Sequence, residues 1–148
     1  MIRARGSIEA TGIRTFRAMF LTLLAEAYGK AGQADHGLSV MAEALALAEK
    51  TGERFYEVES HRIKGELLRM QDDETEAEVS FQKAIEVACR QEAKSWELRA
   101  AMSLSRLWQK QGKKEEARQL LADVYNWFTE GFDTRDLKDA KALLEELS

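Results

Sequence analysis

The amino-acid sequence predicts an all-α protein, and three observations support this fold class. The 148 residues include no proline, whereas average usage would give about seven. Ala, Leu and Glu, which favour helices, number 21, 17 and 19, whereas Val, Ile and Thr, which favour strands, number 5, 5 and 7. The third observation is an internal repeat, which also predicts how the helices are arranged.

The chain repeats itself with a period of about 40 residues. When the sequence is aligned with itself after a shift of 40 residues, Gly32 falls on Asp72 and Gly112. Small residues then align with small residues, and large residues with large ones. The small sets are Ala25, Gly65, Ser105 and Gly37, Ala77, Ala117; the large sets are Met41, Phe81, Leu121, then Tyr28, Leu68, Trp108, and Phe16, Tyr56, Trp96. Such alternation lets neighbouring helices approach closely and interlock. We therefore predict an α-solenoid of three helix pairs with a C-terminal capping helix.

Apolar residues recur at helical spacing within each unit, which sets the expected helices. Unit 14–51 is predicted to hold helices 14–31 and 34–51. Unit 54–91 is predicted to hold helices 54–71 and 74–91, and unit 94–129 helices 94–111 and 114–129. Gly52 is expected to end one helix, and Asp73 with Glu76 has the sequence of a capping box at the start of another.

The last predicted helix covers residues 135–147 and would begin at Asp133 or Thr134, with Asp136 in its first turn. It carries Leu137, Ala140, Leu144 and Leu147 on one stripe. A stacked array needs such a terminal element to cover its last open face. We expect one repeat domain over residues 14–148, preceded by a flexible segment at 1–13.

The pattern of these units resembles the tetratricopeptide repeat. In the first unit the order is small, aromatic, glycine, small, large and small, at Ala25, Tyr28, Gly32, Gly37, Met41 and Ala44. The usual period is about 34 residues, so these units are longer, and the proline typical of the repeat is missing. The resemblance implies a non-enzymatic module that binds a peptide or protein in a concave groove lined by the first helix of each pair.

Residues from about 20 to 147 also resemble the C-terminal repeat region of large bacterial signalling proteins. In those proteins the repeats follow a class III nucleotide cyclase or DNA-binding domain and a P-loop ATPase. The segments Ala-Lys-Ser-Trp-Glu-Leu-Arg-Ala-Ala (93–101) and Trp-Phe-Thr-Glu-Gly-Phe-Asp-Thr (127–134) carry this likeness. It implies, as an alternative, a regulatory or dimerisation arm that captures no peptide.

Composition and motifs argue against several other functions. The formal charge is −4, which gives no general reason to bind nucleic acid or an anionic membrane. No apolar run reaches the roughly 18–20 residues of a membrane span, and no signal peptide is recognisable. The single cysteine, Cys89, excludes an internal disulfide. We expect a cytoplasmic protein.

No residue pattern predicts catalysis, a metal site or a cofactor. Phosphate-binding glycine loops are absent from the sequence, and His36 and His61 lack the spacing of metal ligands. The acidic run from Asp72 to Glu78 lacks the glycine of a calcium loop, and its carboxylates are better explained as complements to a helix dipole. Cys89 is expected to be largely buried.

Aromatic residues are concentrated in the last third of the chain, and two interpretations are open. They are Trp96, Trp108, Tyr125, Trp127, Phe128 and Phe132. A ligand-binding cage is one interpretation. Core packing of the last repeat against the final helix is favoured, because the aromatics follow the repeat register.

The repeat register also predicts which residues line the groove. The second unit would contribute Arg62, Glu66 and Arg69, the third Arg99, Arg106 and Lys110, and the first Met19, Thr22, Leu23, Glu26 and Lys30. We take Arg62, Arg69, Arg99, Arg106 and Lys110 as a candidate site for an acidic or carboxylate-ended partner. Solvated helix-face charges are the alternative.

The first helix predicts a second contact surface. Residues 16–27 are apolar on nearly every side, and such a helix is normally buried on more than one face. We expect either a homodimer through Phe16, Met19, Phe20 and Leu23, or cover by residues 1–13 folding back.

Overall fold

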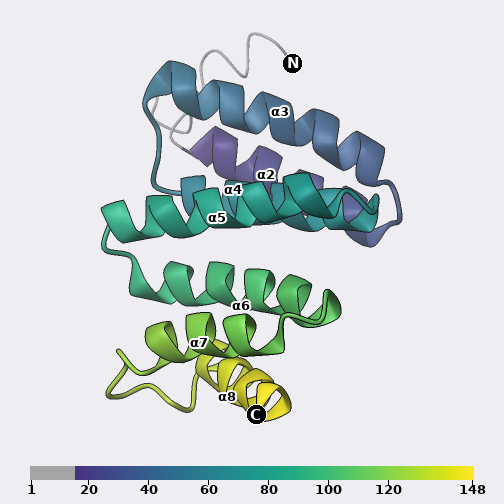
Figure 1. Cartoon of the computed structure of the whole chain (residues 1–148). Helices are drawn as coiled ribbons and strands as arrows, with labels where there is room; N and C mark the ends of the chain where they lie inside the picture. Colours follow the sequence, from purple (N-terminus) through teal and green to yellow (C-terminus); the bar gives the residue numbers. More distant parts are fainter. Residues whose placement is uncertain (1–15) are drawn as a thin grey trace, which may run out of the picture.

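The computed structural model describes residues 16–148, and within this range it contains helices and no strand (Figure 1). The prediction of an all-α fold is thus confirmed. The helices are α2 (Arg17–Lys30), α3 (Ala34–Thr51), α4 (Glu57–Met70), α5 (Glu74–Arg90), α6 (Lys94–Lys110), α7 (Lys114–Tyr125) and α8 (Arg135–Leu147). The flexible segment predicted at 1–13 lies outside the described residues. None of the described helices is long and apolar enough to cross a membrane.

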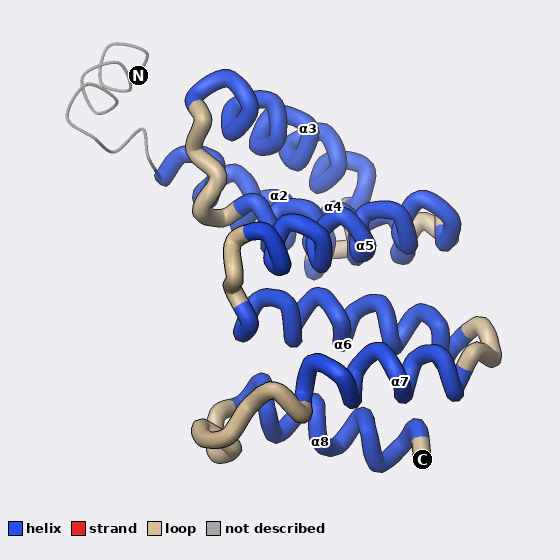
Figure 2. The backbone as a smooth tube through the Cα atoms, turned by 60° about the vertical axis from the view of Figure 1, so that its left-hand side comes forward, coloured by secondary structure: helices blue, strands red, loops and turns tan. Residues whose placement is uncertain are grey.

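The helices stack as the predicted α-solenoid (Figure 2). Consecutive helices form the hairpins α2–α3, α4–α5 and α6–α7, and α8 packs on both α6 and α7. In addition α2 packs closely on α4, α4 on α6, and α6 on α8, whereas the backbones of the described helices α3, α5 and α7 lie farther from one another. The row α2, α4, α6 and α8 is thus more closely packed than the row α3, α5 and α7. Such a stack of helix pairs must curve, and the closely packed row lies on its concave side. We call the surface of α2, α4, α6 and α8 the inner face.

The turns within the hairpins repeat with the sequence period. Gly32, Asp72 and Gly112 have positive φ angles of 79°, 61° and 83°. In each turn the next residue donates its N–H to a carbonyl five residues back, at 2.8, 2.9 and 2.8 Å, in the pairs Gln33–Tyr28, Asp73–Leu68 and Lys113–Trp108. These bonds satisfy carbonyl groups that the helix end leaves without a partner. Asp72 adopts the left-handed conformation that glycine occupies in the other two units.

Helix ends agree with the predicted caps. Gly52 ends α3 in the left-handed region and donates its N–H to Ala48. Asp73 accepts from the N–H of Glu76 at the start of α5. Of the two residues considered for the start of α8, Thr134 is the cap, because its hydroxyl accepts from the N–H of Leu137.

Small residues create slots for large ones in the core. The Phe81 side chain on α5 is fully buried against α4 at Gly65. A Cβ atom at Gly65 would lie 2.5 Å from Cε1 of Phe81, far inside van der Waals contact. Met41 and Leu121, at the same position of the other units, are also buried. The predicted small-to-large alternation therefore describes real packing between the helices of a pair.

The largest departure from the predicted elements is at α7. The period predicts a helix to residue 129, but α7 ends at Tyr125 and residues 126–134 form a loop. Trp127 lies on this loop and is 58% exposed, and Phe132 is also exposed. The prediction that these two side chains belong to the core is therefore wrong. Trp108, Tyr125 and Phe128 do pack, partly buried, against the core of the last repeat.

Cys89 is a second correction. The thiol is exposed and not buried as expected, because it lies in the last turn of α5 one position beyond Ala88, which faces the core. Two causes raise the pKa of the Cys89 thiol: partial burial, which is the larger, and the neighbouring Glu97 carboxylate. The thiolate needed for nucleophilic chemistry is thus disfavoured.

Candidate functional site

Two of the predicted groove residues, Arg62 and Arg99, meet at a buried carboxylate on the inner face. Glu59 on α4 accepts from Nε of Arg62 at 2.7 Å and from Nη1 of Arg99 at 2.6 Å. The side chain of Glu59 is only 3% exposed, whereas those of Arg62 and Arg99 are 12% and 38% exposed. Nε of Arg99 also lies 3.7 Å from Asp136 on α8. This ion cluster joins α4, α6 and α8.

The other basic residues predicted for the groove lie nearer the C-terminal ends of α4 and α6. Arg69 is 3.4 Å from Glu66, and Lys110 is 3.0 Å from Glu74 on α5. Arg106 is exposed and forms no hydrogen bond or ion pair with any residue in the described part of the chain. We call Arg69, Arg106 and Lys110 the basic end of the inner face.

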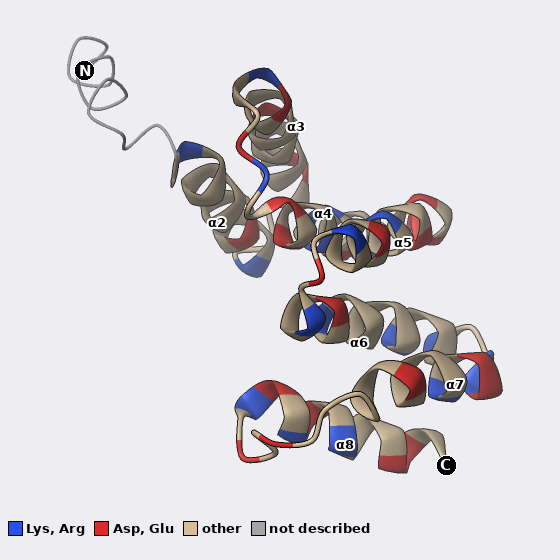
Figure 3. Cartoon of the chain, turned by 90° about the vertical axis from the view of Figure 1, so that its left-hand side faces the viewer, with Lys and Arg blue, Asp and Glu red and all other residues tan. Residues whose placement is uncertain are grey.

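Acidic side chains thus neutralise much of the positive charge that we predicted for the groove. Glu59, Glu74 and Asp136 were not among the predicted groove residues, yet Glu59 pairs with two of the groove cations and Glu74 and Asp136 with one each. Figure 3 shows the result as acidic and basic segments interleaved along α4 and α5. The pairing of Glu59 with Arg99 could have been found from the sequence, because the two residues lie one repeat period apart and so occupy matching positions on neighbouring helices.

Four of the groove residues predicted in the first two units, Glu26, Lys30, Arg62 and Glu66, share a surface, whereas Thr22, also predicted for the groove, is buried. A small cavity of about 110 Å³ between α2 and α4 is lined by Glu26, Lys30, Ile63, Leu67, Arg62, Glu66 and Met70. Charged groups therefore surround an apolar floor of Ile63 and Leu67. A depression of this kind can accept an apolar side chain of an extended peptide whose polar backbone stays at the rim.

The predicted contact surface of the first helix is exposed. Phe20 is 56% exposed, Phe16 and Leu23 are also exposed, and Met19 is half-buried. Phe55, which precedes α4, extends the patch, since its ring contacts that of Phe16 at 5.8 Å in an edge-to-face arrangement. We call Phe16, Phe20, Leu23, Leu24 and Phe55 the α2 patch.

Two of these positions, those of Phe20 and Leu23, are buried in both later units. In the second unit Ser60 on α4 takes the position of Phe20. It forms a hydrogen bond with Thr22 on α2, with 2.8 Å between the two hydroxyl oxygens. Ala100 on α6 takes this position in the third unit and packs with Val58. Ile63 replaces Leu23 and is buried in the core between the first two units. The α2 patch is thus the face on which a preceding helix pair stacks in this architecture.

The histidines and the acidic run have local structural contacts. His36 stacks on Tyr28, with ring centroids 5.6 Å apart. Nε2 of His61 lies 3.8 Å from buried Glu57, and burial lowers the pKa of His61 in spite of that carboxylate. Within the acidic run, Glu78 accepts from the indole N–H of Trp108 at 2.8 Å. No group of three or more His, Cys, Asp or Glu side chains among residues 16–148 could hold a metal ion.

A comparison with protein families shows a partial match. The family model of the tetratricopeptide repeat matches residues 98–126, which cover most of α6 and all of α7. No curated protein matches the chain. Residues 98–126 of the third helix pair are therefore similar to a tetratricopeptide repeat, within a solenoid whose other two pairs follow the same 40-residue pattern.

Proposed function

We propose that this protein is a non-enzymatic protein–protein interaction module that binds a segment of a partner protein along its inner face. The observation that carries the proposal is the match of α6 and α7 to an interaction repeat, together with the row of α2, α4, α6 and α8 contacts. The small cavity between α2 and α4 supports it, because it offers an apolar depression on that face. A cytoplasmic location is part of the proposal.

The basic end of the inner face is the best contact for acidic residues of such a partner. Arg106 has no partner among the described residues. Arg69 and Lys110 are engaged only in solvent-accessible ion pairs, which are generally worth about 0–1 kcal/mol. A partner carboxylate can replace such a pair at little cost. Arg62 and Arg99 differ, because buried Glu59 holds both of them and a ligand carboxylate would have to compete with that buried partner.

Peptide binding with charge-reversed variants tests this proposal. The probes are a fluorescent ten-residue peptide of alternating Glu and Leu and its Gln/Leu counterpart, followed by fluorescence anisotropy. We expect the Glu peptide to bind, and the triple variant Arg69→Glu, Arg106→Glu, Lys110→Glu to weaken it at least tenfold. Arg118→Glu on α7 is the matched control, since it reverses a charge outside the inner face. Equal binding of both peptides, or unchanged affinity in the triple variant, would contradict the acidic preference.

The α2 patch favours a second function, that of a regulatory or dimerisation arm. Two of its large apolar residues, Phe20 and Leu23, are exposed at positions that the later units bury. A second copy that pairs α2 with α2 would cover this surface. The likeness of segments 93–101 and 127–134 to bacterial signalling proteins suggests the setting, a nucleotide cyclase or ATPase-coupled transcriptional regulator. Cyclase or P-loop motifs encoded directly upstream would favour it.

Sedimentation velocity separates this second function from the first. We expect the wild-type chain to form dimers at micromolar concentration, and Phe20→Glu to be monomeric. Val79→Glu on α5 is the control, because Val79 is an equally exposed apolar residue outside the patch. A wild-type monomer at 100 µM, or a dimer that survives Phe20→Glu, would contradict dimerisation through α2.

A further inference from the structure

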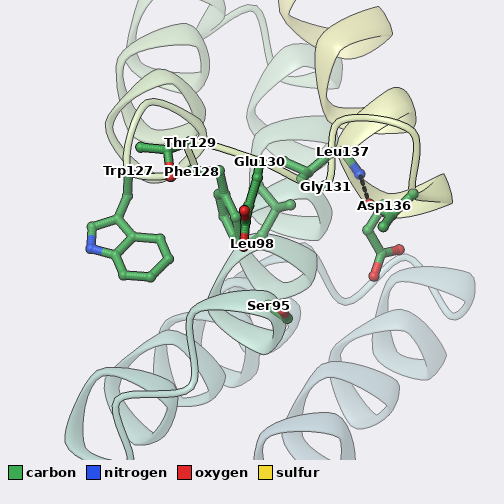
Figure 4. Close-up of a pocket in the computed structure, with 10 residues that line it drawn as sticks. Ser95, Leu98, Trp127, Phe128, Thr129, Glu130, Gly131, Asp136 and Leu137 are labelled. Atoms are coloured by element: carbon green, nitrogen blue, oxygen red, sulfur yellow. Dashed lines mark hydrogen bonds between the residues drawn. The ribbon is translucent and has the colours of Figure 1, made fainter.

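A cavity of about 470 Å³ lies at the C-terminal end of the array (Figure 4). Its walls come from the start of α6, from the loop after α7, and from the start of α8. The lining residues are Ser95, Leu98, Trp127, Phe128, Thr129, Glu130, Gly131, Thr134, Asp136 and Leu137. Segments 93–101 and 127–134, distinctive in the sequence but without an evident role, thus meet at one site. The volume is in the range of small-ligand and side-chain pockets.

The cavity exists because the third unit departs from the repeat. Helix α5 continues to Arg90, and its last turns bury Val87 and Ala88 against α4 and α6. Trp127 and Phe128 are the residues one period later, but α7 has already ended at Tyr125. The chain instead leaves the helix and passes around the start of α6. Core packing does not explain an indole that is 58% exposed at this position.

One part of the cavity is aromatic and attracts cations. The rings of Trp127 and Phe128 are perpendicular, with centroids 5.2 Å apart. The ammonium group of Lys94 lies 5.6 Å from the centroid of the Trp127 ring, in the range of a cation–π contact. In Figure 4 Trp127 lies at one end of the cavity and Asp136 at the other, with Leu98, Phe128 and Glu130 between them.

The charged residues of the lining are both acidic. Glu130 forms no hydrogen bond or ion pair with any residue between 16 and 148. Asp136 is 3.7 Å from Nε of Arg99, but that guanidinium makes its closer contact, at 2.6 Å, with Glu59. Lys94, the cation nearest the indole, is paired with Glu97 at 3.1 Å. The cavity therefore has an excess of negative charge beside an exposed aromatic surface.

We propose that this cavity binds the side chain of an arginine from a partner protein. A guanidinium is planar, so it can stack on Trp127 while its N–H groups donate to Glu130, and Asp136 at the other end of the cavity adds negative charge. Its methylene groups would lie against Leu98 and Phe128. Charge complementarity favours a cation, and the combination of a flat ring with carboxylates favours arginine over lysine. This site is separate from the basic end of the inner face and takes a ligand of opposite charge, so neither proposal depends on the other.

NMR titration of the full chain tests the proposal with defined probes. The probes are acetyl-Gly-Arg-Gly-amide and the same peptide with citrulline, which has nearly the same shape but no charge. We expect saturable shifts of the Trp127 indole N–H and the Gly131 amide with the arginine peptide, and at least tenfold weaker binding of the citrulline peptide. Equal affinity for the two peptides, or no saturable shift at millimolar concentration, would overturn the proposal.

Substitutions then assign the contacts. Glu130→Gln removes an unpaired carboxylate on an exposed loop and should lower the affinity for the arginine peptide at least fivefold. Trp127→Ala should weaken it similarly. The matched control is Glu146→Gln, which removes an exposed carboxylate elsewhere on α8 and should leave binding unchanged. Equal loss in Glu130→Gln and Glu146→Gln would show that only overall charge matters, and would also overturn the proposal.

Discussion

Val87 and Trp127 occupy the same position of the repeat, forty residues apart, yet Val87 is 2% exposed and Trp127 is 58% exposed. The difference does not follow from hydrophobicity, since both residues are apolar. It follows from the helix that carries them, because α5 continues past Val87 whereas α7 ends before Trp127. The repeat period therefore predicts burial only where the backbone also repeats.

The two regions also differ in how neighbouring units are joined. Around Val87, side chains of α4, α5 and α6 form one continuous apolar cluster. Around Trp127, the corresponding space is a cavity with an aromatic wall and unpaired acidic charge. The first arrangement stabilises the stack, whereas the second leaves chemical groups available to another molecule. Substitutions in the two regions should therefore have different consequences.

The largest loss of stability is expected from Phe81→Ala in the regular region. The substitution empties a fully buried slot, and comparable Phe→Ala changes cost about 3–5 kcal/mol. Urea unfolding followed by circular dichroism at 222 nm gives the free energy. A loss below about 1 kcal/mol would show that the interior is loosely packed.

A second substitution shows whether the slot at Gly65 is specific for Phe81. In the wild-type background Gly65→Ala should be destabilising by about 1–3 kcal/mol, because the new Cβ collides with the Phe81 ring. In the Phe81→Ala background the same change should be neutral or stabilising, since alanine favours the helix. Equal effects in the two backgrounds would exclude the predicted coupling.

The next largest effect is expected at the ion cluster of the inner face. Glu59→Gln leaves Arg62 and Arg99 without their shared carboxylate, and we expect a loss of about 2–3 kcal/mol. This is less than the 3–5 kcal/mol typical of a fully buried pair, because Arg99 reaches solvent. Glu66→Gln is the control, since its pair with Arg69 is partly exposed and should be worth less than about 1 kcal/mol. Similar losses in both variants would contradict a structural role for Glu59.

Val87→Ala tests the regular side of the comparison directly. The change removes two buried methyl groups, each worth about 0.8 kcal/mol, so we expect a loss of about 1.5–2 kcal/mol. The same urea titration measures it. A loss below 0.5 kcal/mol would mean that this end of α5 contributes little to the stack, and would remove the contrast with Trp127.

The sequence was sufficient to predict the repeated part of the fold. Gly32, Asp72 and Gly112 mark the turns because each must adopt a positive φ angle. Gly65 and Phe81 are complementary in size, and that relation can be read from a shifted alignment. The early end of α7 could not be predicted in this way, because apolar spacing continues through Trp127 and Phe128, and no glycine or proline marks the end.

The candidate sites were harder to predict than the fold. Register placed Arg62 and Arg99 on one face, and the offset of one period between Glu59 and Arg99 was a signal for their pairing, but register could not show that Glu59 is buried and also binds Arg62. Helical periodicity also placed Cys89 near the core, although a rotation of one position at a helix end is enough to expose a side chain. The burial of a charged group and the ends of helices depend on three-dimensional contacts that a one-dimensional pattern does not contain.

A smaller effect is expected from His61 in the regular region. Burial lowers the pKa of His61 below its usual 6.5, so the unfolded chain binds a proton more readily than the folded one. The contribution of His61 to stability is therefore complete above pH 6.5 and declines as the pH falls toward the folded-state pKa. We compare the unfolding free energies of wild type and His61→Gln from pH 8 to pH 5. The wild type should lose stability relative to the variant as the pH falls. A difference that is constant with pH would contradict this linkage.

The smallest change in stability is expected from Trp127→Ala, although it deletes the largest side chain of this series. More than half of Trp127 is already in contact with solvent, so unfolding exposes less additional apolar surface than at a buried tryptophan, and we expect a loss of about 1 kcal/mol. Trp108→Ala is the matched control, because that indole is partly buried and donates to Glu78, so its loss should be clearly larger. Equal losses at the two tryptophans would mean that the loop after α7 acts as core. If Trp127→Ala loses little unfolding free energy but no longer binds the arginine peptide, then Trp127 serves binding and not the stability of the fold.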